Sequence, residues 1–330
     1  MTWKGKDWGQ LRNLSPGELG DYMGQGIPAA TSDSDKTEVI RWAIDRQEAR
    51  GGGRVVLPDG EEHPISAEIE IPTGVTLCGE TPLTQVTSNV NGNAFRVYEG
   101  AGLESLYIRI TTALSDGNAA VRLYADGVDR FGTVGITRLR DLYIRGSNAT
   151  SGMGIEFHAD TESESATANA AVQYVQVSSC YIRAFCSGVA FRNDEDSGQT
   201  YASYVNGNFF RDMVFASCNV CFECFEGGNS TNAAINGNVI NGVQLQANSF
   251  CINFFKGGVY TERNMFSNVQ LFDWDSDGGS NYQFVCANTS TTAGRGNWFR
   301  GYFSGDADAV IDEVASTDNY CNMNNNDYHT

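Results

Sequence analysis

The segment NGNFFRDMVF, residues 206–215, returns thirty residues later in altered form as NGNVINGVQL, residues 236–245. A period of tens of residues is typical of repeat architectures, and the unit that both copies share, apolar–x–turn–apolar–x–apolar, recurs along the chain. It begins at Leu103, Leu139, Val177, Phe210, Ile240, Phe266 and, more weakly, Phe299. Its last three residues alternate between apolar and other side chains, and this period of two predicts a strand.

A second strand follows the first in most repeats. It ends at Phe157, Phe191, Cys224, Phe254 and, less clearly, Cys286. In three successive repeats its first core-facing residue, Val189, Phe222 or Ile252, comes twelve residues after the start of the unit. The two strands therefore recur together, and loops of different lengths interrupt a constant frame.

One asparagine marks the same corner of several repeats, two residues before the unit begins. These are Asn208, Asn238, Asn264 and Asn297. Stacked asparagines can bond one another through their amides, and asparagine tolerates the left-handed backbone that a sharp corner needs. Recurring strands with a stacked polar corner predict a parallel β-helix whose coils lie about 4.8 Å apart.

The segment 32–79 predicts the N-terminal end of this coil stack. Asp33 or Ser34 can cap a helix over about residues 34–50, which the glycines at 51–53 end. Its apolar face is formed by Val39, Ile40, Ala43 and Ile44. Strands are expected at 55–57, 69–71 and 75–77.

This stretch resembles the N-terminal start of the pectate-lyase-like superfamily of right-handed parallel β-helices. There a D-x-x-x-I-x-x-A-I helix leads into G-G-G-x-V-x-L-P-x-G and then I-P-x-G-V-x-L-x-G, and here TEVIRWAI, GGGRVVLPDG and IPTGVTLCG follow in the same order. The resemblance implies an all-β chain, a single right-handed parallel β-helix with an N-terminal helical cap over residues 32–305. Residues 1–31 precede it, and residues 306–330 are expected to form a C-terminal cap or assembly tail.

Composition narrows the classes of partner. The net charge of -18 argues against nucleic acid, which a basic surface would bind. Arginines number 18 against 4 lysines, and this acidic, lysine-poor balance is similar to that of proteins from hypersaline organisms, although compositional drift would also produce it. The N-terminus has no apolar stretch, which predicts no signal peptide and no membrane span.

Carboxylates are the candidate catalytic groups. The motifs N-T-D, G-H-G and W-x-D-H, which mark the better-known enzymes of the superfamily, do not occur, and with three histidines a histidine-based mechanism is not expected. Glu156 and Glu223 are predicted at one outward position two coils apart, about 9–10 Å, and Asp160 and Asp194 on adjacent coils, about 5 Å. Such separations are typical of inverting and retaining glycosidases respectively. Chance alignment among 40 acidic residues is the alternative, as is a solvated turn at 193–198.

The strand sequence Y-I-R predicts an outward ladder on three consecutive coils. Its tyrosines are Tyr107, Tyr143 and Tyr181, and its arginines are Arg109, Arg145 and Arg183. Aromatic rings beside guanidinium groups suit an anionic glycan or a neighbouring subunit. The alternative is ordinary strand chemistry, with each arginine paired to a local carboxylate.

Two motifs suggest metals. In DWDSDGG, residues 273–279, the side chains of Asp273, Asp275 and Asp277 are similar to the start of a calcium loop, but Phe284 stands where the closing glutamate belongs. We therefore expect no required cofactor, a candidate Ca²⁺ site, or simply an acidic loop. The run C-x-x-C-x-x-C at 218–224 predicts cysteines on alternating faces of a strand, which disfavours a shared metal.

The resemblance implies three candidate functions, because the superfamily includes virus tail spikes as well as polysaccharide-cleaving enzymes, and a virion protein released by lysis needs no signal peptide. The first is a virion surface or tail spike of a virus of prokaryotes: a homotrimer, made in the host cytoplasm, that binds a host-surface polysaccharide or glycoprotein and joins other virion proteins through an anchor at residues 1–31. The second is a polysaccharide depolymerase, a glycoside hydrolase or lyase that is either extracellular or carried by the same spike. The third is a purely structural virion or surface protein.

Overall fold

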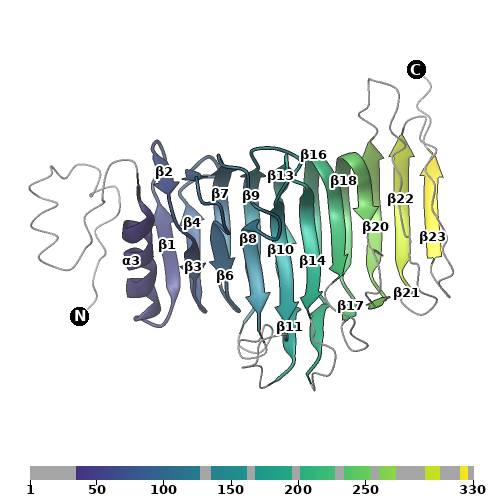
Figure 1. Ribbon diagram of the computed structural model, residues 1–330, viewed down its shortest axis with the longest axis horizontal. Coiled ribbons are helices and arrows are strands. Elements are labelled where there is room, and N and C mark those ends of the chain that lie inside the picture. Colours follow the sequence, from purple (N-terminus) through teal and green to yellow (C-terminus); the bar gives the residue numbers. More distant parts are fainter. Residues whose placement is uncertain are drawn as a thin grey trace, which may run out of the picture.

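The computed structural model describes residues 35–126, 135–161, 168–194, 201–226, 234–253, 260–272, 294–304 and 320–325. Helix α3 (Thr37–Glu48) closes one end of a long stack of strands, and the strands succeed one another along the stack to its other end (Figure 1). Paired strands are parallel throughout these residues. The predicted parallel β-helix with an N-terminal helical cap is confirmed.

The strands fall into groups that follow one another around each coil. A five-stranded sheet contains β11 (Ala170–Gln173), β15 (Ser203–Asn206), β17 (Ala234–Asn236), β19 (Tyr260–Glu262) and β21 (Gly294–Arg295). The other sheet contains β1 (Gly53–Leu57), β2 (Glu62–Ile65), β3 (Ile69–Ile71), β4 (Val75–Gly79), β5 (Gln85–Ser88), β6 (Phe95–Val97), β7 (Gly102–Ile110), β8 (Ala119–Ala125), β9 (Arg138–Arg145), β10 (Met153–Asp160), β12 (Gln176–Ser178), β13 (Tyr181–Arg183), β14 (Ser187–Asp194), β16 (Phe209–Glu226), β18 (Val239–Asn253), β20 (Met265–Phe272), β22 (Trp298–Ser304) and β23 (Tyr320–Asn325).

The repeat unit read from the sequence sets the register. The seven unit starts form one continuous column, in which Leu103 pairs with Leu139 and the pairing continues coil by coil to Phe299. The turn position of the unit has a left-handed backbone, with φ between 51° and 67°, at Ser105, Asp141, Ser179, Asp212, Gly242 and Asn268. This single left-handed residue bends each strand, so that the apolar residues on both of its sides face the core.

The asparagine ladder is confirmed, but the prediction that the asparagine itself adopts the left-handed backbone is wrong. Asn208 Nδ2 donates to Asn238 Oδ1 at 3.0 Å, and the next two steps measure 2.9 and 3.0 Å, all at side chains with no exposed surface. The left-handed residue at this corner is the one before the asparagine: Gly207, Gly237, Arg263 or Gly296. The asparagine side chain therefore turns inward, where it replaces backbone hydrogen bonds at the corner.

The core is apolar and aromatic along its length. Phe157 stacks on Phe191 with centroids 5.4 Å apart, and Phe266 stacks on Phe299 at 5.0 Å. Cysteines at 218, 221 and 224 all lie in this core, contrary to the alternation predicted for them. A left-handed residue at Ser217 and shifts of register on both sides of Cys218 break the period of two.

The cap helix covers the first coil with Ile40 and Ile44. The helix begins at Thr37, later than the predicted residue 34. At this end the Asp35 carboxylate accepts hydrogen bonds from the N–H of Thr37 at 2.9 Å and from the hydroxyl of Thr37 at 2.6 Å. The proposed caps at 33 and 34 lie outside the described residues. Gly51 to Gly53 end the helix with positive φ values, as predicted.

The two terminal segments of the predicted domain scheme are mostly outside the described residues. Residues 1–31 are not covered, and of 306–330 only β23 is described, where it adds a parallel strand in register with β22. No helix in the described ranges has the length and apolar character needed to cross a membrane.

Candidate functional site

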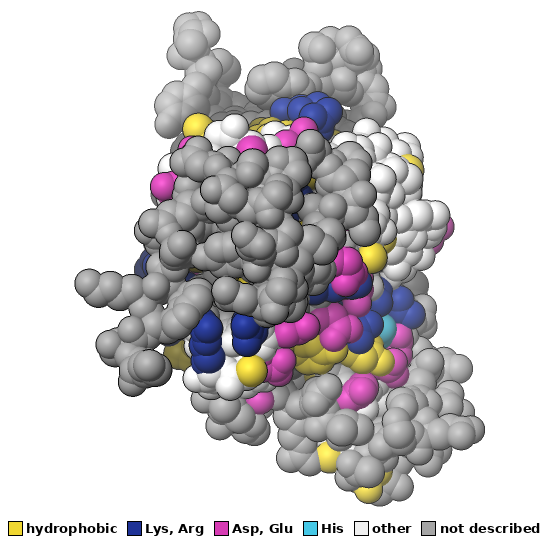
Figure 2. All heavy atoms as spheres, turned by 90° about the vertical axis from the view of Figure 1, so that its left-hand side faces the viewer, with side chains coloured by type: hydrophobic (Ala, Val, Ile, Leu, Met, Phe, Trp, Pro, Cys, Tyr) yellow, Lys and Arg dark blue, Asp and Glu magenta, His cyan; other side chains and the backbone are white. Residues whose placement is uncertain are grey.

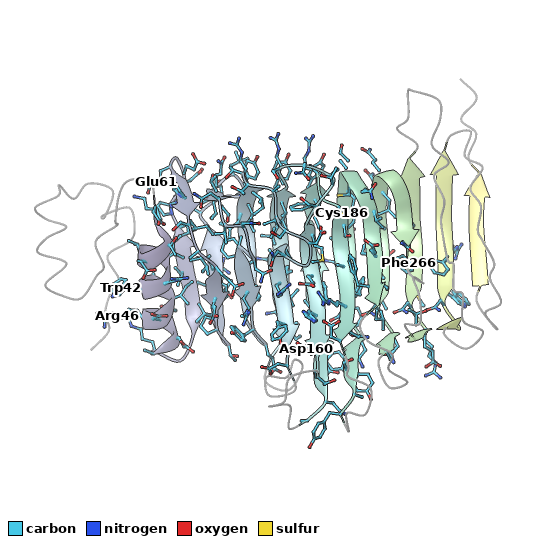
Figure 3. The ribbon with its side chains drawn as sticks, in the orientation of Figure 1. Trp42, Arg46, Glu61, Asp160, Cys186 and Phe266 are labelled. Atoms are coloured by element: carbon cyan, nitrogen blue, oxygen red, sulfur yellow. The ribbon has the colours of Figure 1, made fainter. Side chains whose placement is uncertain are left out.

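The four predicted catalytic carboxylates lie together on the outer face of β10, β14 and β16, which we call the carboxylate face. Glu156 and Glu223 occupy one column with Ala190 between them, and Asp160 pairs with Asp194 on the next coil. Both alignments agree with the sequence prediction; the catalytic role itself stays a prediction. Asp160 lies near the edge of the stack (Figure 3).

This outer face is largely buried, unlike an ordinary surface patch. Glu156 is 0% exposed, Glu223 and Asp194 are each 5% exposed, and His158 is 6% exposed. Asp194 is the last residue of β14, so the alternative of a solvated turn is wrong at this position. Carboxylates are seldom buried to this extent without partners, and each has them here.

Glu156 is held by an arginine from the preceding coil. Arg122 Nε forms an ion pair with Glu156 Oε2, and Arg122 Nη2 donates to the carbonyl oxygen of Gly117. Gly117 belongs to the connection between β7 and β8, which therefore lies against this face. One guanidinium therefore bridges two acceptors and fixes both the carboxylate and the connection.

Asp194 lies between two cationic or polar neighbours. His158 Nε2 and Arg192 Nε each lie 2.7 Å from Asp194 Oδ2. Burial by itself would raise the pKa of Asp194, but hydrogen bonds from His158 and Arg192, with their charges, lower it overall. Asp194 therefore stays ionised and cannot act as a general acid near neutral pH.

Hydroxyl groups bond to the other two carboxylates. Tyr124 donates to Asp160 Oδ2 at 2.8 Å, and Ser187 Oγ donates to Glu223 Oε2. Burial, followed by the hydrogen bond to Asp160, raises the pKa of Tyr124, so this phenol stays a donor. Acidic and basic side chains surround a histidine on the side of the molecule shown in Figure 2.

His158 is the residue that sequence reasoning missed. The segment E-F-H-A-D, residues 156–160, contained the signal, since a period of two brings Glu156, His158 and Asp160 to one face. Its ring makes an edge contact with Tyr124 at 5.1 Å. In the described part of the chain, His158 Nδ1 and Glu156 Oε1 are buried without a hydrogen-bond partner, and 3.9 Å separates them.

The Tyr–Arg ladder is the second candidate site: Tyr107, Tyr143, Tyr181, Arg109, Arg145 and Arg183. Register places each type in one column over β7, β9 and β13, as predicted. Tyr107 and Tyr143 stack with centroids 4.6 Å apart, and Tyr181 meets Tyr143 edge-on at 4.9 Å. Tyr107 and Tyr143 therefore cover one face of each other, whereas Tyr181 and Tyr143 meet edge to face.

The ladder arginines differ from those of the carboxylate face. Arg109 and Arg145 are exposed, and over the described residues none of the three ladder arginines forms an ion pair with a carboxylate, whereas Arg122 and Arg192 do. A hydrogen bond with the Tyr143 hydroxyl raises the pKa of Arg183 further above its usual value. The alternative of local carboxylate pairing thus finds no support in the described part of the structure.

No metal centre emerges in the described residues, where no three His, Cys, Asp or Glu side chains are arranged to hold an ion. The candidate calcium ligands Asp273, Asp275 and Asp277 lie outside those residues. The calcium interpretation stays a prediction.

Comparisons with known proteins concern the fold. No family model and no curated protein matches the chain. The solved structure of ORF18 from Geobacillus virus E2 is 14% identical with a TM-score of 0.42, over 98% of this chain and 66% of that one. The A-module of mannuronan C-5 epimerase AlgE4 from Azotobacter vinelandii is 16% identical with a TM-score of 0.44, over 91% and 94%.

A tailspike protein of E. coli bacteriophage HK620 is 11% identical with a TM-score of 0.44, over 88% of this chain and 63% of that one. The chain thus spans about two thirds of the length of the two viral proteins. Its strand register and cap place it in the fold class of right-handed parallel β-helices.

Proposed function

We propose that this chain is a virion surface spike protein of a virus of prokaryotes and that its Tyr–Arg ladder binds a glycan of the host cell surface. The observation that carries the glycan part is the ladder itself: three guanidinium groups in register, without carboxylate partners in the described residues, beside tyrosine hydroxyls. Like charges at coil spacing repel one another, so an anionic partner is favourable. The virion part rests on the sequence resemblance to a superfamily that includes virus tail spikes.

The binding mode follows from the ring stacking. Because the rings of the three tyrosines contact one another, recognition is mainly by hydroxyl and guanidinium hydrogen bonds to carboxylate, sulfate or phosphate groups of the glycan. Such contacts are partly electrostatic, so the affinity for the glycan should fall as the salt concentration rises.

The test compares ladder variants on an array of acidic and neutral prokaryotic polysaccharides. Tyr143→Ala with Arg145→Ala should lose binding to the glycans that the unaltered protein retains. Arg138→Ala is the matched control, since Arg138 is exposed on the same strand β9 but lies outside the ladder columns. Equal binding by all three proteins would exclude the ladder as the receptor site.

Glycan cleavage is a second candidate function, and the carboxylate face favours it. In the described residues, buried carboxylates surround an imidazole, and two facing atoms, His158 Nδ1 and Glu156 Oε1, have no hydrogen-bond partner. Such an arrangement is unusual away from functional sites. Glu156→Gln with Glu223→Gln, and Asp160→Asn with Asp194→Asn, should each abolish release of reducing ends from a host polysaccharide. Full cleavage by both double variants would remove the site assignment.

The remaining parts of the proposal come from the sequence. They are a homotrimer, attachment to other virion proteins through residues 1–31, a candidate Ca²⁺ site at 273–277, and a hypersaline host. A purely structural protein is the alternative that the absence of any glycan binding would favour.

A further inference from the structure

The tautomer of His158 follows from its partner. Asp194 Oδ2 accepts from Arg192 Nε and lies 2.7 Å from His158 Nε2, and a carboxylate that stays ionised can only accept. The proton of a neutral His158 ring therefore sits on Nε2. Nδ1 is left with its lone pair, on the side of the ring that faces Glu156.

Two hydrogen-bond acceptors then face each other in a buried place. His158 Nδ1 and Glu156 Oε1 are 3.9 Å apart, and within the described residues neither has a partner. A buried acceptor without a donor destabilises the folded state, so a folded chain seldom retains two of them side by side. One oxygen with two O–H bonds can donate to both, and water is such a group.

We propose that His158 Nδ1 is the general base of the carboxylate face and that Asp194 is a positioning residue that fixes the His158 ring. This inference rests on the second candidate function, glycan cleavage. It changes the role predicted for Asp194, which in this assignment orients the base and does not touch the sugar.

The step is hydrolysis of a glycosidic bond. A water molecule that donates to His158 Nδ1 and Glu156 Oε1 passes one proton to Nδ1 while its oxygen bonds to the anomeric carbon. The bond from that carbon to the leaving sugar oxygen breaks, and this oxygen takes a proton from solvent. His158 then releases its own proton to solvent, so the net reaction adds one water.

Charge around the ring supports this proton transfer. The imidazolium that forms lies between the carboxylates of Asp194 and Glu156, which stabilise it without being protonated. Tyr124 holds Asp160 on the same face by its 2.8 Å hydrogen bond. General-base catalysis of this kind contributes about 10²–10⁴-fold to a rate.

The first test measures which ring nitrogen of His158 carries a proton and needs no substrate. In protein with ¹⁵N-labelled histidine, long-range ¹H–¹⁵N spectra at pH 7 should show His158 protonated on Nε2 and bare on Nδ1. Asp194→Asn should disturb this tautomer, because an amide can donate as well as accept. Asp160→Asn is the matched control, since it lies in register on the adjacent coil, and it should leave the His158 tautomer unchanged.

A ring protonated on Nδ1 alone, or on both nitrogens at pH 7, would overturn the proposal, because neither form has a free base on the Glu156 side. This outcome leaves the glycan-cleavage function standing with a different base. The spectrum of the unaltered protein decides between these outcomes, so the test holds even where a variant fails to fold.

The second test measures reducing-end release from a panel of purified capsular polysaccharides. His158→Gln retains a donor toward Asp194 but has no basic nitrogen, and it should lower the rate by about 10²–10⁴-fold at pH 7. The rate of the unaltered protein should fall on acidification, and the residual rate of His158→Gln should not follow it. Unchanged cleavage by His158→Gln would refute the base assignment, whereas no cleavage by the unaltered protein would refute both it and the cleavage function.

Discussion

Replacing Asn238 by alanine tests how the coils are held in register. Its amide makes four hydrogen bonds: Oδ1 accepts from the N–H of Asn208 at 3.1 Å and from its Nδ2 at 3.0 Å, and Nδ2 donates to Val205 O at 3.1 Å and to Asn264 Oδ1 at 2.9 Å. All of these atoms belong to the buried corner, and alanine removes every one of the four bonds. At about 1 kcal/mol net for each, Asn238→Ala should lower the free energy of unfolding by roughly 4 kcal/mol.

The control is another asparagine in the same repeat unit. Asn241 accepts one hydrogen bond from Asn268 at 2.7 Å on the exposed surface, so Asn241→Ala should cost less than about 1 kcal/mol. Urea unfolding followed by circular dichroism gives both values, and equal slopes against urea would show that the unfolded states match. Equal losses from the two variants, or a loss below about 1 kcal/mol for Asn238→Ala, would refute the assigned role of the ladder.

Three further predictions concern packing, acid and assembly. Gly188→Ala should lower the free energy of unfolding by about 1–3 kcal/mol, because the added methyl group would lie 2.5 Å from Phe215 Cδ1. An unchanged free energy of unfolding in urea would contradict this prediction. Since the pKa of Asp194 is lowered on folding, the stabilisation it provides is present above its unfolded value of about 3.9 and is lost as pH falls below it. The free energy of unfolding should therefore drop more between pH 5 and 3 in the unaltered protein than in Asp194→Asn, and parallel losses would contradict this. Light scattering should give a mass three times that of the 35.8 kDa chain. A trimer that forms only in multimolar salt would indicate a hypersaline host, and a monomer at every salt concentration would contradict the spike proposal.

The coil architecture was predictable because its determinants are local. Alternating apolar residues and one left-handed position per unit define the strand register, and Leu103 and Leu139 could be aligned without knowledge of any contact between them. The asparagine ladder followed from the same frame. Its left-handed neighbour was misassigned because glycine and asparagine both suit that conformation, and sequence alone does not separate adjacent positions.

The candidate site was predictable in its alignment and not in its chemistry. Strand period and register placed Glu156, Asp160 and Asp194 on one face. Their burial depends on segments that come from elsewhere in the chain, such as the connection at Gly117 that bonds to Arg122. The number of histidines in the whole chain gives no indication of His158, whereas its place between two carboxylates depends only on the local alternation of the strand.

A crystal structure of the protein with an oligosaccharide from a polysaccharide that it binds would test the proposed receptor site without an intermediate step. We expect sugar density on the Tyr–Arg ladder, with an anionic group of the glycan within hydrogen-bond distance of Arg145 and of the Tyr143 hydroxyl. Sugar bound on another face, with the ladder bare at saturating ligand, would contradict the proposal.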